Sequence, residues 1–131
     1  MKKPSKRWKE FCQIIEIVDI RIGKQQRILE RLRKEYQIIN EKIAEKWRDI
    51  ESEQYSLKNL YLLDEQEALS RMFRRRECIK STIETLYFDV SALSQEAEEL
   101  VVKTTAAEKE KHRLEKRKEA MGELLLQVKY E

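Results

Sequence analysis

The side chains that could carry out chemistry are few and scattered along this sequence. His112 is the only histidine, and Cys12 and Cys78 have no metal-ligand spacing. Gly23 and Gly122 stand alone, so the chain has no glycine-rich loop that could cradle a phosphate. The acidic residues are numerous, but they fall on open helical patterns with no pocket to shift their pKa. We therefore expect no enzymatic activity, no cofactor, no metal site and two reduced thiols.

The composition indicates what kind of element carries these residues. Charged and hydrophobic residues each make up 40% of the chain, whereas there are only two glycines and one proline. Turns depend on glycine and proline, so a compact globule with many turns is disfavoured. A seam between two helices needs only about two apolar residues in seven, which suits this composition. We expect one all-α domain over residues 1–131.

Apolar residues recur at alternating spacings of three and four, the heptad pattern in which positions a and d form a seam between helices. In the first half these positions are Phe11, Ile15, Val18, Ile22, Gln25, Leu29, Leu32, Tyr36, Ile39, Ile43, Lys46, Ile50, Glu53, Leu57 and Leu60. In the second half they are Leu69, Met72, Arg76, Ile79, Ile83, Leu86, Val90, Leu93, Ala97, Leu100, Thr104, Ala107, Lys111, Leu114, Lys118, Met121, Leu125 and Val128. A 3.5-residue period kept over so many heptads predicts a coiled coil.

The segment from Leu62 to Glu67 separates the two runs near the middle of the chain. Asp64 can cap a new helix, and Glu67, three residues later, can reach back to it. The sequence therefore predicts a long antiparallel two-helix coiled-coil hairpin, with helices over residues 6–61 and 65–129 and a turn near Leu62–Glu67. A dimer of unbroken helices is the alternative, because isoleucine at position a also suits parallel dimers.

The polar exceptions in the seam predict a register for the hairpin. Its facing pairs are Leu60 with Leu69, Leu57 with Met72, and Ile50 with Ile79. In this register Glu53 faces Arg76. Gln25 likewise faces Thr104. At these two layers each polar or charged seam residue therefore has a polar or charged partner. The register leaves residues 124–128 opposite only residues 1–5, so this apolar end either inserts into something larger or frays.

The surface of the hairpin must carry the function. Aromatic residues off the seam gather in the half nearer the turn: Trp47, Tyr61, Phe73 and Tyr87 beside the seam, and Tyr55 and Phe88 facing away from it. Those beside the seam either widen it or contact a partner, whereas those facing away favour a partner. Basic residues dominate residues 1–34 and 103–118, and Arg71 with Arg74–Arg76 forms a second basic group. We expect acidic protein surfaces as partners and no nucleic acid, because no nucleic-acid motif is present.

No apolar stretch approaches the length of a membrane span, and the apolar run behind the basic N-terminal residues is broken by Glu16, Asp19 and Arg21. We therefore expect no secretory signal, no direct membrane insertion and a cytoplasmic protein that is a monomer when free.

The turn segment carries a resemblance to a known family. Leu62-Leu63-Asp64, followed by Gln66 and by Met72-Phe73, resembles the turn of the type III secretion central stalk proteins, the SctO or YscO group related to flagellar FliJ. The length, charge and heptad plan of the whole chain are similar to that family as well. The Leu-Leu-Asp segment favours a virulence system over a flagellar one.

The resemblance implies a non-enzymatic stalk that links a hexameric secretion ATPase to the cytoplasmic domain of the export gate. Such a stalk promotes ATPase activity and protein secretion, can bind export chaperones, and lies in the bacterial cytoplasm against the secretion apparatus at the inner membrane. The expected ATPase-binding residues, at the terminal end, are Arg7, Trp8, Lys118, Leu124, Leu125 and Val128. The expected gate-binding residues, in the turn half, are Trp47, Tyr55, Phe73, Arg74, Arg75 and Phe88. A generic coiled-coil adaptor or scaffold is the alternative function.

Overall fold

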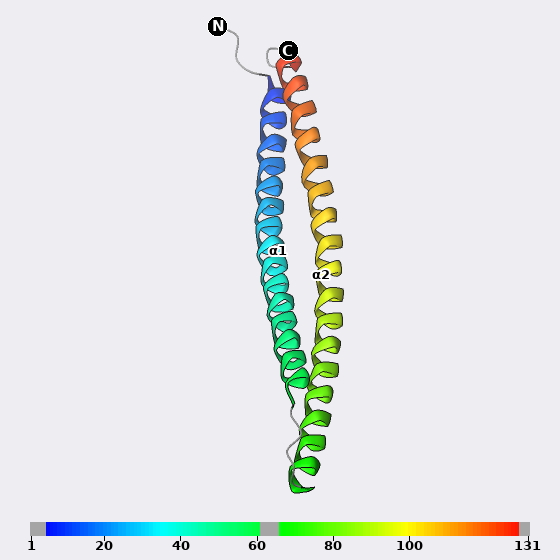
Figure 1. Cartoon of the computed structure of the whole chain (residues 1–131). Coiled ribbons are helices and arrows are strands. Elements are labelled where there is room, and N and C mark those ends of the chain that lie inside the picture. Colours follow the sequence, from blue (N-terminus) through cyan, green and yellow to red (C-terminus); the bar gives the residue numbers. More distant parts are fainter. Residues whose placement is uncertain (1–4, 61–65, 129–131) are drawn as a thin grey trace. The chain divides into compact units, whose positions relative to one another are not determined.

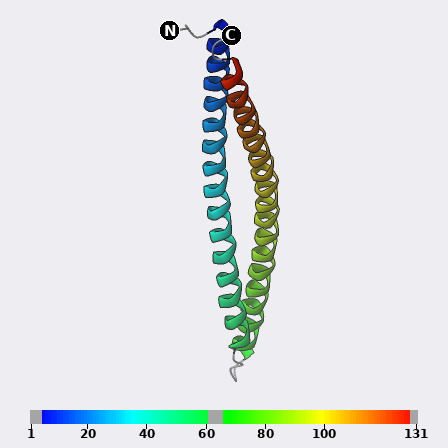
Figure 2. The same cartoon turned by 90° about the horizontal axis from the view of Figure 1, so that it is seen from above.

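The chain folds as an all-α hairpin of two helices. The structure is a computed structural model that describes residues 5–60 and 66–128, with the side chains of the second segment described from Leu69 onward. Helix α1 spans Lys6–Lys58 and helix α2 spans Gln66–Val128. Figures 1 and 2 both place the first turn of α1 beside the last turn of α2, so the helices run antiparallel. This arrangement confirms the predicted fold class.

The packing of the hairpin falls into two units, each built from parts of both helices. The first unit joins residues 1–35 to residues 100–131, and the second comprises residues 36–99. In each unit a stretch of α1 therefore packs against a stretch of α2.

Local hydrogen bonds explain where α1 begins and ends. At the start, the Trp8 N–H donates to Ser5 Oγ at 3.1 Å, and the Lys9 N–H donates to the Ser5 carbonyl at 3.2 Å, which makes Ser5 the N-cap. At the other end, the Asn59 side-chain amide donates to the Tyr55 carbonyl at 2.7 Å. The Asn59 backbone N–H donates to the same carbonyl at 3.1 Å, so this oxygen accepts two hydrogen bonds at the last turn. Helix α1 ends at Lys58, three residues before the predicted end near residue 61.

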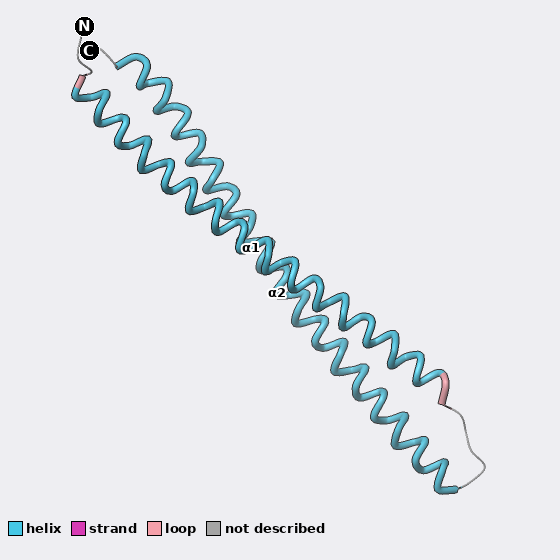
Figure 3. Tube along the Cα trace, turned by 90° about the vertical axis from the view of Figure 1, so that its left-hand side faces the viewer, coloured by secondary structure: helices cyan, strands magenta, loops and turns pink. Residues whose placement is uncertain are grey.

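The sequence predicts a helix cap and a surface aromatic residue in the connection between the helices. Figure 3 shows the short non-helical stretch that follows α1. The predicted cap formed by Asp64 and Glu67, and the predicted surface residue Tyr61, lie outside the residues and side chains that the structure describes.

The buried core of each unit consists entirely of predicted seam residues. In the first unit they are Val18, Leu29, Leu32, Leu100, Ala107, Leu114 and Val128. In the second unit they are Ile50, Ile79, Leu86, Val90 and Ala97. No polar or charged side chain is buried among the described residues. The heptad phase read from the sequence is therefore the one that the structure uses.

The predicted register, in contrast, is wrong by about one heptad. It placed Asp19 opposite Glu110, but Lys118 Nζ lies 2.6 Å from Asp19 Oδ1. It placed Lys46 opposite Ile83, but Lys46 Nζ lies 3.6 Å from Asp89 Oδ2. Eight residues of helix correspond to about 12 Å, so the first ion pair cannot form in the predicted register.

The physical reason is that the seam lysines find partners outside the seam. The stems of Lys46 and Lys118 lie along the seam while their ammonium groups reach aspartates on the flank of the other helix. The predicted register pairs Glu53 with Arg76, because it matches seam residues only with other seam residues. In the structure Arg76 is exposed, and no ion pair joins it to Glu53.

Candidate protein-binding surfaces

One hydroxyl group ties the beginning of α1 to the end of α2. Ser5 Oγ accepts a hydrogen bond from the Trp8 N–H and donates one to the Val128 carbonyl at 2.7 Å. A serine hydroxyl has one donor and two acceptor sites, so both bonds can form together. We call the exposed surface beside this hydrogen bond, on the first turn of α1 and the last turn of α2, the terminal surface. Ser5 is not among the predicted site residues, although a serine directly before a helical pattern is a recognised cap signal.

The predicted ATPase-binding residues differ in how far their side chains are exposed to solvent. Arg7, Lys118 and Leu124 are exposed, Trp8 and Leu125 are half-buried, and Val128 is buried. Val128 is buried because, in the observed register, the end of α2 does not run past the start of α1. The predicted register would have left it uncovered. Val128 contributes to the hairpin itself, so only the outward residues of this set form an accessible surface.

Two further apolar groups on the first unit were not predicted as sites. Leu126 is 79% exposed on the outward side of the last turn of α2. Ile17 and Ile20 are exposed one helical turn apart on α1. Their heptad positions alone could have revealed all three, because an apolar residue at an outward position has no intramolecular partner.

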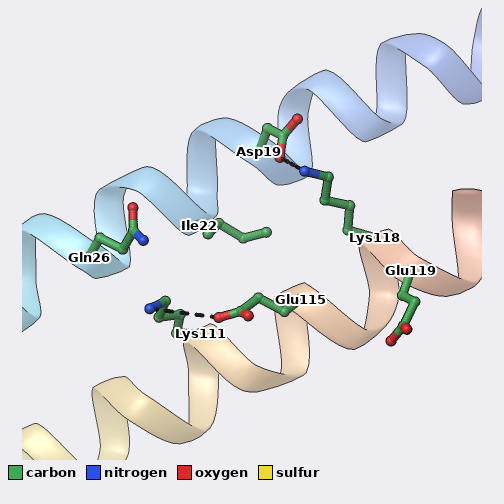
Figure 4. Close-up of a pocket in the computed structure, with 7 residues that line it drawn as sticks. All are labelled: Asp19, Ile22, Gln26, Lys111, Glu115, Lys118 and Glu119. Carbon is green, nitrogen blue, oxygen red and sulfur yellow. Dashed lines mark ion pairs between the residues drawn. The ribbon is translucent and has the colours of Figure 1, made fainter.

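A shallow charged groove of about 550 Å³ lies between α1 and α2 in the first unit (Figure 4). It is lined by Asp19, Ile22, Gln26, Lys111, Glu115, Lys118 and Glu119. Lys118 reaches across to Asp19, and Lys111 Nζ lies 3.8 Å from Glu115 Oε1 on its own helix. These pairs compensate the charge of two lysines at seam positions. The groove is therefore accounted for by the packing of the hairpin.

The aromatic residues of the second unit separate into two groups. The rings of Trp47 and Tyr87 meet edge to face, with centroids 5.7 Å apart and planes at 81°. Gln54 Nε2 donates to the Tyr87 hydroxyl at 3.2 Å. These cross-helix contacts support the interpretation that Trp47 and Tyr87 widen the seam. Trp47 is nevertheless 44% exposed, which leaves one side of its ring accessible.

The other aromatic residues of this unit face solvent. Tyr55 is 70% exposed, Phe88 is 77% exposed, and Phe73 is half exposed. Arg74 and Arg75 are exposed directly after Phe73. We call this set the turn-half surface: Tyr55 on the outward side of α1, and Phe73, Arg74, Arg75 and Phe88 on α2. Exposed aromatic and arginine side chains are the residue types most enriched where proteins bind proteins.

The remaining side chains that could do chemistry stay apart from one another. His112 and Cys78 are exposed, Cys12 is half-buried, and both cysteines are free thiols. Arg113 donates to Glu110 through Nε at 3.0 Å and Nη2 at 2.7 Å, and this hydrogen bonding lowers the pKa of the Glu110 carboxyl. No group of three or more histidine, cysteine or acidic side chains able to hold a metal ion occurs in residues 5–60 and 69–128.

Comparison with known proteins leaves these surfaces as the main guide to function. No family model, curated protein or solved structure matches the chain. Within the described part of the chain, neither helix is long and apolar enough to cross a membrane.

Proposed function

We propose that this protein is the non-enzymatic central stalk of a bacterial type III secretion ATPase complex. The stalk would link a hexameric ATPase to the cytoplasmic domain of the export gate, at the cytoplasmic side of the inner membrane. The observation that carries the proposal is the Ser5–Val128 hydrogen bond, which holds the beginning of α1 and the end of α2 together. Two helices side by side are about 20 Å across, which is narrow enough to enter a ring-shaped partner.

The terminal surface supports the assignment of the ATPase to the first unit. Basic residues outnumber acidic ones within residues 1–34, and Arg7 is exposed there. Lys118 is also exposed, but its charge is paired with Asp19. Leu124 and Leu126 add exposed apolar area at the end of α2. A basic surface with apolar anchors suits an acidic channel, because charge guides association and buried apolar side chains hold the complex.

The turn-half surface supports the assignment of the export gate to the second unit. Tyr55 and Phe88 are largely exposed and Phe73 is half exposed, and the arginines that follow Phe73 supply charge. The same surface could receive export chaperones, which would compete with the gate.

The test measures two activities for two matched variants. Leu126→Asp and Phe88→Asp each place a charge on a side chain that is more than three-quarters exposed, so neither should unfold the hairpin. We expect the wild-type protein to raise the ATP hydrolysis rate of the hexameric secretion ATPase of the same organism. Leu126→Asp should abolish that stimulation and keep binding to the gate domain, and Phe88→Asp should do the reverse.

Circular dichroism of each variant shows whether the helices persist. Full stimulation by Leu126→Asp together with Leu124→Asp would contradict insertion of the terminal surface. If the wild-type protein stimulates no ATPase but retains other proteins through the turn-half surface, the alternative function of a coiled-coil adaptor replaces the stalk.

A further inference from the structure

The two flanks of the first unit carry different patterns of charge. With Ile22 of α1 and Lys118 of α2 at position a, positions e and b of both helices lie on one flank of the seam, and positions g and c lie on the other. The e and b flank contains the charged groove of Figure 4, and we call it the paired flank. Its ion pairs are Lys118 with Asp19 at 2.6 Å, Lys111 with Glu115 at 3.8 Å, and Arg33 with Glu108 at 3.3 Å.

The opposite flank has a large excess of cations. We call basic flank the surface formed by positions g and c over residues 14–31 of α1 and 103–117 of α2. Glu110 is the one acidic residue at these positions of the sequence. The basic residues there are all exposed and are Arg21, Lys24, Arg31, Lys103, Arg113 and Arg117.

Two of these six cations have a carboxylate partner. Arg113 donates two hydrogen bonds to Glu110, and Arg31 Nε lies 3.8 Å from Glu35 Oε1. Hydrogen bonding by Arg113 is the main cause of the lowered pKa of Glu110, and the charge of Arg21 contributes as well. Arg21 on α1 therefore lies near Glu110 on α2, as expected for two g positions on the same flank.

The other four cations of the basic flank form no ion pair with any residue that the structure describes: Arg21, Lys24, Lys103 and Arg117. Two of them lie on each helix, so the positive charge extends across the width of the hairpin. It also extends along the hairpin, because Arg21 and Arg31 are about 15 Å apart on α1. Aliphatic side chains lie among these cations: Ile17 is 50% exposed, and Ile14 and Ile28 are half-buried.

The paired flank indicates the shape of the partner. Besides its ion pairs, it carries the exposed acidic residues Glu16, Glu30 and Glu119. A partner that encloses the unit meets these acids as well as the cations, whereas a planar partner can meet the basic flank alone. The charge of the basic flank is therefore best matched by a planar anionic surface. Cations next to exposed aliphatic side chains are the combination that binds the surface of an anionic bilayer.

We propose that the basic flank binds peripherally to the anionic surface of a phospholipid bilayer, with the first unit lying along the bilayer plane. The four unpaired cations contact lipid phosphates, and Ile17 contacts the boundary between headgroups and acyl chains. The paired flank faces the water. The terminal surface lies outside the basic flank, so this binding does not depend on the stalk assignment.

Co-sedimentation of the full chain with lipid vesicles tests the proposal. We expect the wild-type protein to bind vesicles of phosphatidylglycerol mixed with phosphatidylcholine and not vesicles of phosphatidylcholine alone. Binding should weaken as the salt concentration rises, because salt screens the lipid charge. Equal binding to both kinds of vesicle would overturn the proposal. Failure to bind the anionic vesicles would overturn it as well, and an acidic protein would then be the partner of this flank.

Two double variants test whether the cations of this flank carry the binding. Lys24→Gln with Lys103→Gln removes one unpaired cation from each helix. Each basic residue near an anionic membrane contributes about fivefold to binding, so this variant should bind about 25-fold more weakly. The control, Lys9→Gln with Lys116→Gln, removes the same charge from exposed positions of the same unit outside the basic flank, and should weaken binding less than about threefold. Equal losses would show that net charge alone drives binding and would contradict the proposal.

A second pair of variants tests the aliphatic contact. Ile17 and Ile38 are each 50% exposed on α1, but Ile38 lies in the second unit. Ile17→Ala should weaken binding to the anionic vesicles several-fold, and Ile38→Ala should leave it unchanged. An unchanged affinity for Ile17→Ala, or equal losses for the two variants, would refute the placement of Ile17 at the bilayer. Circular dichroism of each variant confirms that the helices persist.

Discussion

The most informative mutation is Ile50→Ala, because Ile50 is among the most completely buried side chains of the hairpin. It is 1% exposed and packs with Leu86 and Val90 in the second unit. Truncation of a buried isoleucine to alanine destabilises a protein by about 2–5 kcal/mol, through lost burial and the cavity left behind. Small domains are stable by only about 5–15 kcal/mol, so this loss is a large share of the total.

The matched control is Ile38→Ala on the same helix and in the same unit. Ile38 is 50% exposed, so its truncation should change the free energy of unfolding by less than about 0.5 kcal/mol. Alanine also has the higher helix propensity, which offsets part of any loss at either position.

Urea unfolding followed by circular dichroism measures both variants. With a urea dependence of about 1–3 kcal/mol per molar, the Ile50→Ala midpoint should fall by about 0.7 M or more, while the Ile38→Ala midpoint stays close to that of the wild type. Equal losses for the two variants would refute the heptad phase, since Ile38 would then be buried against a surface that the hairpin does not have.

Three further predictions follow from the first unit. Leu114→Ala should lower the free energy of unfolding by about 2–5 kcal/mol, because Leu114 is 1% exposed; Leu126→Ala, at a 79% exposed position, should leave the unfolding curve nearly unchanged. Ser5→Ala should destabilise the start of α1 by about 1 kcal/mol through loss of the N-cap, seen as faster amide hydrogen exchange in the first turn. Arg113→Gln should raise the pKa of Glu110 toward its ordinary value in an NMR titration, because the hydrogen bond that lowers it is lost; an unchanged pKa would mean that the ion pair does not persist in solution.

The fold could be predicted from the sequence because the heptad pattern constrains it almost completely. Glycine and proline are scarce, and apolar residues recur at a 3.5-residue period on both sides of one polar interruption. Burial then follows from the pattern, which is why Val18, Leu29 and Leu114 are buried as expected. The start of α1 at Lys6 agrees with the predicted start near residue 6, although Ser5 was not identified as its cap.

The register could not be predicted from seam residues alone. A shift of one heptad leaves apolar layers facing apolar layers, so the choice depends on weaker polar contacts at the flanks. Lys118 reaches Asp19 and Lys46 reaches Asp89 through long, flexible side chains whose direction a heptad diagram does not show. The assumed length of the turn compounded the error, because α1 ends before residue 61.

The exposure of the candidate surface residues could be predicted in part, for a similar reason. Outward heptad positions identify exposed aromatics without a structure, as for Tyr55 and Phe88. Residues beside the seam are harder, because Trp47 gained a partner in Tyr87 across the hairpin. Val128 was expected to be available and is buried, which follows directly from the register error.

The central claim is that the two halves of one chain pack against each other in antiparallel order. A pulsed electron paramagnetic resonance distance between spin labels at Lys24→Cys and His112→Cys, with Cys12 and Cys78 replaced by serine and the sample diluted with unlabelled protein, tests it directly. Both positions are exposed and lie at the level of the charged groove. The hairpin predicts a distance of about 20–30 Å, set by the width of two neighbouring helices. A single unbroken helix would place these positions about 130 Å apart, so the absence of the short distance in the diluted sample would contradict the hairpin.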